Sequence, residues 1–183
     1  MNVSTTPLPG VLVVEPRVFG DARGFFLETF HAGRYAEKGL PTTFVQDNWS
    51  RSAKGILRGL HFQNPKAQGK LVWCVRGAVY DVAVDVRVGS PHFGKWFGLE
   101  LSEATKKQLW VPPGFAHGFC VLSDEADFVY KCTELYAPQN EQSVLWNDPA
   151  LGIEWPVSAP ALSGKDAKAL PLAQVANLPR YQA

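Results

Sequence analysis

Apolar residues occur along this chain in short runs that are separated by glycine, proline and small polar residues. The clearest alternation covers residues 78–88, where successive side chains would point to opposite faces of a strand. One face would hold Ala78, Tyr80, Val82, Val84 and Val86, and the other Val79, Asp81, Ala83, Asp85 and Arg87. Helical periodicity is rare along the chain, so the pattern predicts an all-β sandwich or barrel.

The pattern also predicts where individual elements lie. Residues 19–24 contain glycine at both position 20 and position 24 and are expected to form a turn. Residues 31–38 are expected to form a short helix, which Gly39 and Pro41 would end. Residues 70–76 and 78–88 are expected to pair with each other around Gly77. The predicted strands cover residues 10–17, 24–30, 43–50, 55–63, 70–76, 78–88, 93–101, 107–111, 118–122, 128–135 and 143–146.

The length of 183 residues suits one domain with a full hydrophobic core. From about residue 148 the alternation gives way to proline-rich loops, with a short helix expected near residues 165–169. We therefore expect residues 1–183 to form a single domain whose part from about residue 148 onward wraps the β core as a tail.

The composition is that of an ordinary soluble globular protein. It is informative mainly because of the classes of protein that it excludes. The formal net charge of +1 gives no excess that favours binding to nucleic acid or to a membrane surface. No apolar run approaches the roughly 18 residues of a membrane span, and the N-terminus lacks the pattern of a secretory signal. Cys74, Cys120 and Cys132 have neither metal-site nor disulfide spacing. The expected location is the cytoplasm.

His61 lies in a short apolar strand, so its imidazole is expected to point inward. An inward imidazole can be a satisfied core residue, a metal ligand or a general base. Arg58 lies three residues before it and Lys70 nine residues after it, and such a group of cations favours an anionic ligand. Strict alternation would put Arg58 and His61 on opposite faces. We favour a β-bulge at Gly59 that turns both side chains toward one side.

The segment from Pro112 to His117 has the Pro-x-Gly-x-x-His spacing of the second motif of cupins, which are small double-sheeted jelly rolls. Metal-binding cupins also carry an earlier His-x-His and a glutamate, because a divalent ion needs three or four converging ligands. This chain has no such motif, and His31 and His92 stand alone in loop-like settings. The segment therefore predicts a cupin-like jelly-roll barrel that holds no metal, with His31 and His92 at the surface.

Eight patterns, taken together and in this order, resemble the dTDP-4-dehydrorhamnose 3,5-epimerase family. They are Arg23-Gly24-Phe25-Phe26-Leu27-Glu28, Gln46-Asp47-Asn48, Leu57-Arg58-Gly59-Leu60-His61-Phe62-Gln63, Gly94 with Trp96, Pro113-Gly114-Phe115-Ala116-His117-Gly118-Phe119, Tyr130-Lys131 with Tyr136, Trp146-Asn147-Asp148-Pro149, and Leu162-Ser163-Gly164-Lys165-Asp166. The similarity runs from about residue 9 to residue 171. It implies conversion of dTDP-4-dehydro-6-deoxy-D-glucose to dTDP-4-dehydro-L-rhamnose, without a cofactor.

Epimerisation beside a ketone requires a base, a group that holds the enolate oxygen, and an acid on the opposite face. The resemblance implies that His61 is the base, Lys70 the enolate holder and Tyr130 the acid. Without the resemblance, Tyr130 is equally well explained as a core aromatic. Asp166 would orient His61, although from composition alone two other aspartates, Asp81 and Asp85, are equal candidates for that role.

The remaining site residues come from the same resemblance. Arg23, Arg58 and Lys165 would lie near the pyrophosphate or the sugar, where an arginine fork suits phosphate oxygens. The nucleoside end of the cleft would be formed by Glu28, Gln46, Asn48, Tyr136, His117 and Glu141, with Tyr136 stacked on thymine. For Glu141 a surface salt bridge is a serious rival. The implied partners are a dTDP-sugar and a second copy of the chain, in a homodimer with exchanged N-terminal strands that cover sheet edges.

Three alternatives remain open. A C5 or C3 single-centre epimerase, or a ketoisomerase, of a deoxysugar pathway would share the barrel and much of the catalytic set. A non-catalytic cupin that binds a nucleotide sugar would not need an acid and a base together. A metal-dependent cupin dioxygenase ranks last because this chain lacks the metal ligands that such an enzyme needs.

Overall fold

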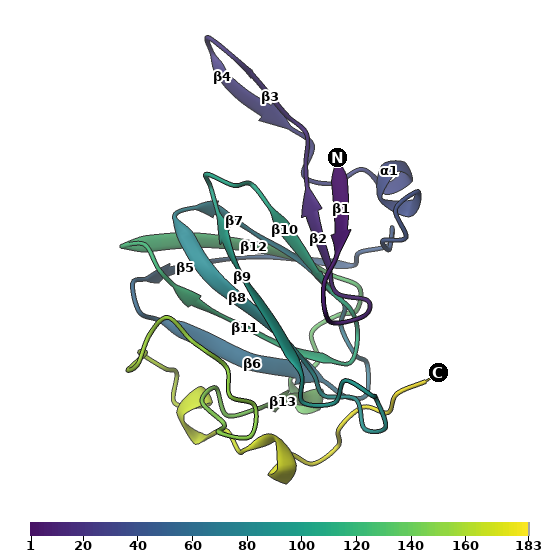
Figure 1. The fold of residues 1–183 in the computed structure, drawn as a ribbon, viewed down its shortest axis with the longest axis vertical. Coiled ribbons are helices and arrows are strands. Elements are labelled where there is room, and N and C mark those ends of the chain that lie inside the picture. Colours follow the sequence, from purple (N-terminus) through teal and green to yellow (C-terminus); the bar gives the residue numbers. More distant parts are fainter. Residues whose placement is uncertain (183) are drawn as a thin grey trace.

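Residues 1–182, which the computed structural model describes, form two antiparallel sheets that pack face to face, with a hairpin that projects from one end (Figure 1). The six-stranded sheet has the order β1 (Asn2–Thr5), β2 (Leu12–Glu15), β10 (Gln108–Val111), β7 (Lys70–Arg76), β12 (Glu125–Cys132) and β5 (Gln46–Ala53). The five-stranded sheet has the order β13 (Glu141–Ser143), β6 (Leu57–Gln63), β11 (Phe115–Val121), β8 (Ala78–Asp85) and β9 (Trp96–Ser102). The prediction of an all-β, cupin-like jelly roll is confirmed.

The main core lies between the two sheets. Val72 and Phe128 of the six-stranded sheet pack in one cluster with Ala83 and Phe119 of the five-stranded sheet. These four residues are at most 5% exposed. A face-to-face pair of sheets buries one side of each strand, which is why alternating strands of this sequence assemble in this way.

The outer face of the five-stranded sheet is buried as well. Val82 and Val84 of β8 pack there with Leu151 and Leu172 of the C-terminal segment, which Figure 1 draws in yellow-green to yellow beside that sheet. The segment is held in part by Asp148, whose carboxylate accepts a 2.7 Å hydrogen bond from the Leu172 backbone N–H. Both faces of β8 are therefore covered, and its aspartates, Asp81 and Asp85, lie on the face between the sheets with no exposed surface.

The expected pairing of residues 70–76 with 78–88 is wrong. Both segments are strands, but β7 pairs with β10 and β12, whereas β8 pairs with β9 and β11. Gly77 is the corner between the sheets, with φ of +74°, and a Cβ there would lie 2.2 Å from the Glu125 carbonyl oxygen. The chain therefore crosses to the other sheet at Gly77, where a hairpin was expected.

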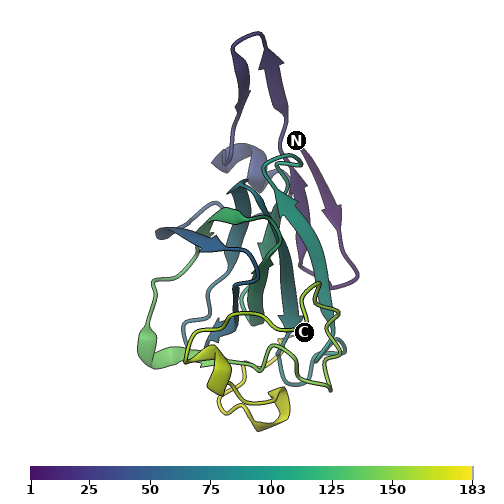
Figure 2. The same ribbon diagram turned by 90° about the vertical axis from the view of Figure 1, so that its left-hand side faces the viewer.

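The turn expected over residues 19–24 is also shorter than predicted. Val18–Asp21 forms β3, which pairs with Gly24–Leu27 (β4) in the projecting hairpin. Asp21 accepts a 2.8 Å hydrogen bond from the Arg23 backbone N–H, and Gly24 has φ of +128°. These two features complete the turn within two residues, so most of residues 19–24 belong to the two strands. Figure 2 shows the hairpin standing clear of the barrel.

The helical segments are short. The predicted helix near residue 31 is confirmed as α1 (Ala32–Ala36), with His31 Nδ1 accepting a hydrogen bond from the Arg34 N–H as its cap. Three 3₁₀ turns follow, at Pro138–Asn140 (η1), Asp166–Lys168 (η2) and Leu172–Gln174 (η3). The strand expected at residues 143–146 lies earlier, as β13. None of the helices in the described residues is long and apolar enough to cross a membrane.

Candidate active site

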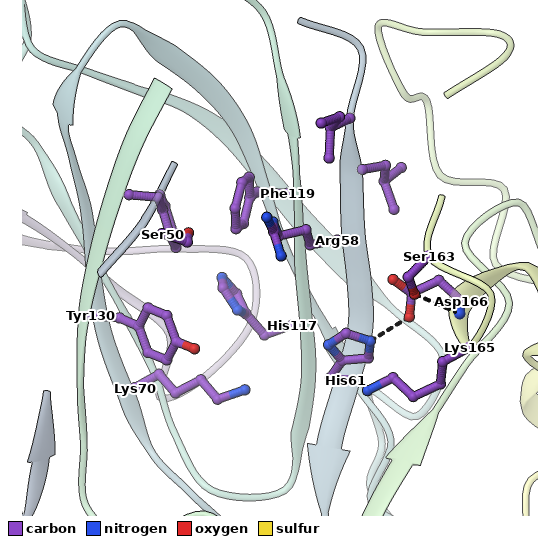
Figure 3. A pocket seen from close by; sticks show the side chains of 13 residues that line it. Ser50, Arg58, His61, Lys70, His117, Phe119, Tyr130, Ser163, Lys165 and Asp166 are labelled. Atoms are coloured by element: carbon purple, nitrogen blue, oxygen red, sulfur yellow. Dashed lines mark hydrogen bonds and ion pairs between the residues drawn. The ribbon is translucent and has the colours of Figure 1, made fainter. Parts of the chain in front are cut away.

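A cavity of about 500 Å³ opens between the sheets beside the tail. A second cavity of about 310 Å³ shares His61, Lys70 and Tyr130 with it, so the two form one cleft. Figure 3 shows Tyr130 and Lys70 on one side of the first cavity and His61 with Asp166 on the other. The polar residues that line the first cavity are Ser50, Arg58, His61, Lys70, His117, Tyr130, Ser163, Lys165 and Asp166.

His61 of β6 is held by a carboxylate from the C-terminal tail. Its Nε2 lies 2.5 Å from Oδ1 of Asp166, whose side chain is 3% exposed, while the His61 side chain is 23% exposed. Burial acts to raise the pKa of Asp166, but the interaction with His61 and the hydrogen bond with Ser163 outweigh it and lower that pKa. Asp166 is therefore an ionised acceptor for Nε2–H, and Nδ1 is the His61 nitrogen left to act on a ligand.

The bulge predicted at Gly59 is confirmed. His61 is opposite His117 and Arg58 is opposite Phe119, so β6 has one more residue than β11 between these two pairs. Gly59 has φ of +125°, and a Cβ there would lie 2.6 Å from the Gly118 Cα. The extra residue brings Arg58 and His61 to the same cavity, and Arg58 Nε donates a 2.9 Å hydrogen bond to Ser52.

Lys70 and Tyr130 come from neighbouring strands of the six-stranded sheet. Burial lowers the pKa of Lys70, and no carboxylate of residues 1–182 lies within 4.0 Å of its ammonium group. Burial raises the pKa of Tyr130, which keeps its hydroxyl protonated near neutral pH. The cleft thus combines a lysine amine without a close carboxylate partner and a protonated phenol, across from an imidazole that can accept a proton.

The second cavity holds a network of amide, phenol and carboxylate groups. Gln46 Oε1 accepts a 2.8 Å hydrogen bond from the Tyr136 backbone N–H, and Gln46 Nε2 donates a 3.0 Å bond to Asn48. The Tyr136 hydroxyl donates to Glu141, which also forms a 2.8 Å ion pair with Lys165. Burial acts to raise the pKa of Glu141, and its bonds with Lys165 and Tyr136 outweigh that effect and lower it. Glu141 is therefore part of the cleft. It also forms a salt bridge, with Lys165, which was the alternative role considered for it from the sequence.

Three buried aspartates, which composition alone could not distinguish, have three different partners. Asp166 binds His61, Asp81 binds His117, and Asp85 binds Arg87 and Ser90. The pairing of Asp81 with His117 was not predicted from the sequence. The inward alternation of residues 79–87 was the available signal, but it does not identify the partner strand.

Two predicted site residues lie outside the cleft of their own chain. Arg23 is at the turn between β3 and β4, where its side chain is 90% exposed and bonded to Asp21. Glu28 follows β4 and pairs with Arg34 of α1. The structure therefore brings together eleven of the thirteen residues, and these two lie on the hairpin and the connection that follows it.

In the part of the chain that the structure describes, no three His, Cys, Asp or Glu side chains are grouped so that they could hold a metal ion. His31 is exposed beside α1, and His92 is half-buried. Ser50, Phe119, Phe128 and Ser163 also line the first cavity but were not predicted. Two of them are core aromatics by pattern, so the sequence carried no separate signal for their presence in the cleft.

Comparison with known proteins gives one consistent result. Residues 5–174 match the model of the family described as dTDP-4-dehydrorhamnose 3,5-epimerase. A protein of that name from Shigella flexneri is 59% identical over 91% of this chain and 93% of its own length. A crystal structure of dTDP-6-deoxy-D-glucose-3,5-epimerase from Legionella pneumophila, in complex with dTDP-4-keto-L-rhamnose, superposes with a TM-score of 0.97 at 53% identity, over 100% of this chain and 99% of that one. A dTDP-4-dehydrorhamnose 3-epimerase from Streptomyces niveus is 42% identical over 99% of this chain and 90% of its own.

Proposed function

This chain belongs to the dTDP-4-dehydrorhamnose 3,5-epimerase family, and we propose that its cleft inverts C3 and C5 of dTDP-4-dehydro-6-deoxy-D-glucose to give dTDP-4-dehydro-L-rhamnose. The observation that carries the proposal is the arrangement of one cavity. This cavity is lined by an imidazole held by a buried carboxylate, by a half-buried lysine without a close carboxylate partner, and by a protonated phenol. Binding alone would require none of this acid and base chemistry.

His61 is the base in this reaction. Its Nδ1 removes the proton from the carbon beside the ketone, and the electrons of the broken C–H bond move onto the C4 oxygen. Asp166 fixes Nε2–H toward itself and stabilises the imidazolium that forms. Because that carboxylate is buried and ionised, turning the ring away would cost it the hydrogen bond from the imidazole.

Lys70 stabilises the enolate. A buried ammonium group without a close counterion is costly, and a negative oxygen that develops beside it removes that cost. The interaction strengthens as charge accumulates on the C4 oxygen, so it favours the transition state over the ground state. Arg58, which lines the same cavity, serves the pyrophosphate or the sugar.

Tyr130 returns a proton from the opposite face. Its raised pKa keeps the phenol protonated until the enolate carbon draws the proton. The tyrosinate is then reprotonated through solvent while His61 loses its proton. Inversion at one carbon uses both residues once, and inversion at C3 and C5 uses them twice.

The second cavity accommodates the nucleotide. The Gln46–Asn48 amides and the exposed ring of Tyr136 suit a pyrimidine, since amides can pair with its polar edge and the phenol ring can stack on its face. Lys165 lines the first cavity, where the sugar would bind, and forms an ion pair with Glu141, which lines the second cavity. The ligand in the proposed function is therefore a dTDP-sugar, and the reaction uses no cofactor.

A homodimer would complete the cleft. The β3–β4 hairpin exposes Phe25 and Phe26 at 63% and 65% and carries Arg23 at its tip. Exposed aromatic residues on a projecting hairpin are suited to burial against a second copy. In that dimer, Arg23 and Glu28 act in the partner's cleft, near the pyrophosphate and the nucleoside. The cytoplasmic location rests on the three free cysteines, which are all buried and typical of a reducing compartment.

The direct test is incubation with dTDP-4-keto-6-deoxyglucose in deuterium oxide, followed by NMR. The proposed function predicts deuterium at C3 and C5 together with the L-rhamno product. Deuterium at one carbon would favour the single-centre alternative, which the similarity to a 3-epimerase supports. Tight binding of the dTDP-sugar without any exchange would favour a non-catalytic cupin.

A further inference from the structure

A second histidine–carboxylate pair lies in the wall of the cavity. His117 Nε2 lies 3.0 Å and 2.9 Å from the two carboxylate oxygens of Asp81. The His117 side chain is 7% exposed and that of Asp81 is fully buried. The two strands that carry them, β11 and β8, are neighbours, and Asp81 is directly opposite Phe119. The pair is therefore a diagonal contact across the sheet, on the face that looks into the cavity.

The imidazole of His117 is fixed in orientation. The Phe128 ring stacks on it, with 6.1 Å between centroids and 18° between planes. An ionised carboxylate has no hydrogen to donate and acts only as an acceptor. The His117 nitrogen that faces Asp81, Nε2, therefore carries the hydrogen. Figure 3 shows the His117 ring between the Tyr130 and Lys70 side of the cavity and the His61 side.

The other nitrogen of His117 is available to a ligand. Nδ1 forms no hydrogen bond within residues 1–182, and it is not a buried orphan, since Trp73 Nε1 is the one buried side-chain polar atom found there without a partner. Nδ1 is therefore open to the cavity that His117 lines. With hydrogen held on Nε2, Nδ1 presents a lone pair, which suits a hydroxyl donor.

We propose that Asp81 is a positioning residue for the epimerase, which holds hydrogen on His117 Nε2 so that Nδ1 accepts a hydrogen bond from a hydroxyl group of the bound hexose. The inference rests on the proposed function, because it gives His117 a defined contact with that substrate. Asp81 itself touches no ligand and acts through His117. A fully buried carboxylate is costly unless it is paired and hydrogen-bonded, and His117 Nε2 is the side-chain partner that Asp81 has.

Asp85 provides a matched control on the same strand. It is four positions from Asp81 on the same face and is also fully buried. Its carboxylate is taken by Arg87 and Ser90, and it lines neither cavity of the cleft. Asp85→Asn thus removes an equally buried charge without altering His117. If buried charge matters only for folding, the two asparagine variants should behave alike.

The experiment compares Asp81→Asn, Asp85→Asn, His117→Ala and the Asp81→Asn/His117→Ala double variant for epimerisation, thermal stability and ¹⁵N NMR of the His117 ring. In Asp81→Asn we expect kcat/KM to fall by about 10- to 100-fold, by analogy with the loss of a carboxylate that orients a metal-binding histidine through its second nitrogen. The double variant should be no slower than His117→Ala, because Asp81 acts through that ring. Asp85→Asn should lose stability but keep kcat/KM within about twofold, since it lies outside the cleft.

The NMR spectra need no turnover. The unliganded wild-type protein should show His117 hydrogen on Nε2 and a bare Nδ1, and Asp81→Asn should populate the Nδ1–H form. Unchanged kcat/KM in Asp81→Asn, additive losses in the double variant, or hydrogen on Nδ1 in the wild-type protein would each overturn the inference. An inactive wild-type protein with the expected NMR pattern would count against the proposed reaction and leave the role of Asp81 in fixing the ring intact.

Discussion

His61 Nε2 lies 2.5 Å from Asp166 Oδ1, although the two residues are 105 positions apart in the sequence. The histidine comes from a strand of the five-stranded sheet and the aspartate from a 3₁₀ turn of the tail. The tail therefore supplies a part of the site that the barrel strands alone do not contain. The bond to Asp166 also explains how the imidazole of His61, on an apolar strand, is held in place while it stays partly exposed to the cleft.

His61→Asn should abolish proton removal while it leaves binding of the nucleotide near the wild-type level. Asparagine keeps the size and polarity of the side chain but cannot accept a proton, and loss of a general base costs about 10²–10⁴-fold in rate. The measurement is deuterium washed into the sugar, with the affinity for dTDP by calorimetry as the control. Exchange at a rate comparable to that of the wild-type protein would show that another group is the base.

The strands were predictable where alternation was regular. Residues 78–85 alternate fully and form β8, and the bulge at Gly59 followed from the need to bring Arg58 and His61 to one side. The pairing of strands was not predictable in the same way. Gly77 reads as a hairpin turn in the sequence, but close backbone approach at this corner sends β8 into the other sheet. A local pattern specifies which side of a strand is buried, and it leaves the neighbouring strand undetermined.

The site was predictable as a set of residue types but not as a set of pairs. Asp81, Asp85 and Asp166 have equal claims by composition. The family resemblance assigned Asp166 to His61, and the folded chain then shows Asp81 with His117 and Asp85 with Arg87. Arg23 is a different case, because it lies far from the cleft of its own chain and its proposed role depends on a second copy.

Exhaustive treatment with EDTA should leave the rate of epimerisation unchanged. The described residues contain no group of three metal-binding side chains, and the proposed chemistry places Lys70 where a metal would hold the enolate oxygen. Turnover should be measured before and after dialysis against the chelator. Complete loss of turnover that a divalent ion restores would contradict this expectation.

Mixed dimers should reveal whether Arg23 acts in the partner's cleft. Arg23→Ala and His61→Asn should each be nearly inactive alone. When they are refolded together, half of the dimers carry both chains, and one of their two clefts combines an intact His61 with an intact Arg23. Activity should then recover to about one quarter of the wild-type value if subunits assort at random. No recovery, with mixed dimers verified by native mass spectrometry, would mean that Arg23 acts within its own chain, and full activity of Arg23→Ala alone would mean that it has no role.

Stability should fall in acid, partly through Asp85. Burial acts to raise its pKa, but bonds from Arg87 and Ser90 outweigh this and lower the pKa from the ordinary value of 3.8. A lowered folded-state pKa stabilises the protein above the unfolded value, and this contribution is lost as the pH falls through the folded value. Urea unfolding between about pH 6 and pH 3 should show the decline beginning near pH 4, since the unfolded carboxyl titrates there.

Asp85→Asn is the matching variant for that experiment. It should lower the free energy of unfolding at pH 7 by about 1–3 kcal/mol, because Arg87 loses a charged partner. Between about pH 4 and pH 3, the free energy of unfolding of Asp85→Asn should fall less steeply than that of the wild-type protein. The reason is that the variant lacks one carboxyl group whose pKa differs between the folded and unfolded states. An identical acid slope in both proteins would show that Asp85 does not contribute to the acid sensitivity.

Tyr130→Phe tests the central claim, which is that two residues on opposite sides of the sugar move the proton. His61 and Lys70 remain in this variant, so the C–H proton should still exchange with solvent, while the phenylalanine ring keeps the packing against Phe128. Inverted product should fall by about 10²–10⁴-fold, the range for a lost general acid, because the enolate is reprotonated from the side of His61. Exchange and inversion should be followed by NMR in deuterium oxide on one sample. We predict that exchange outruns inversion, and a strictly proportional fall of both would contradict a separate acid at Tyr130.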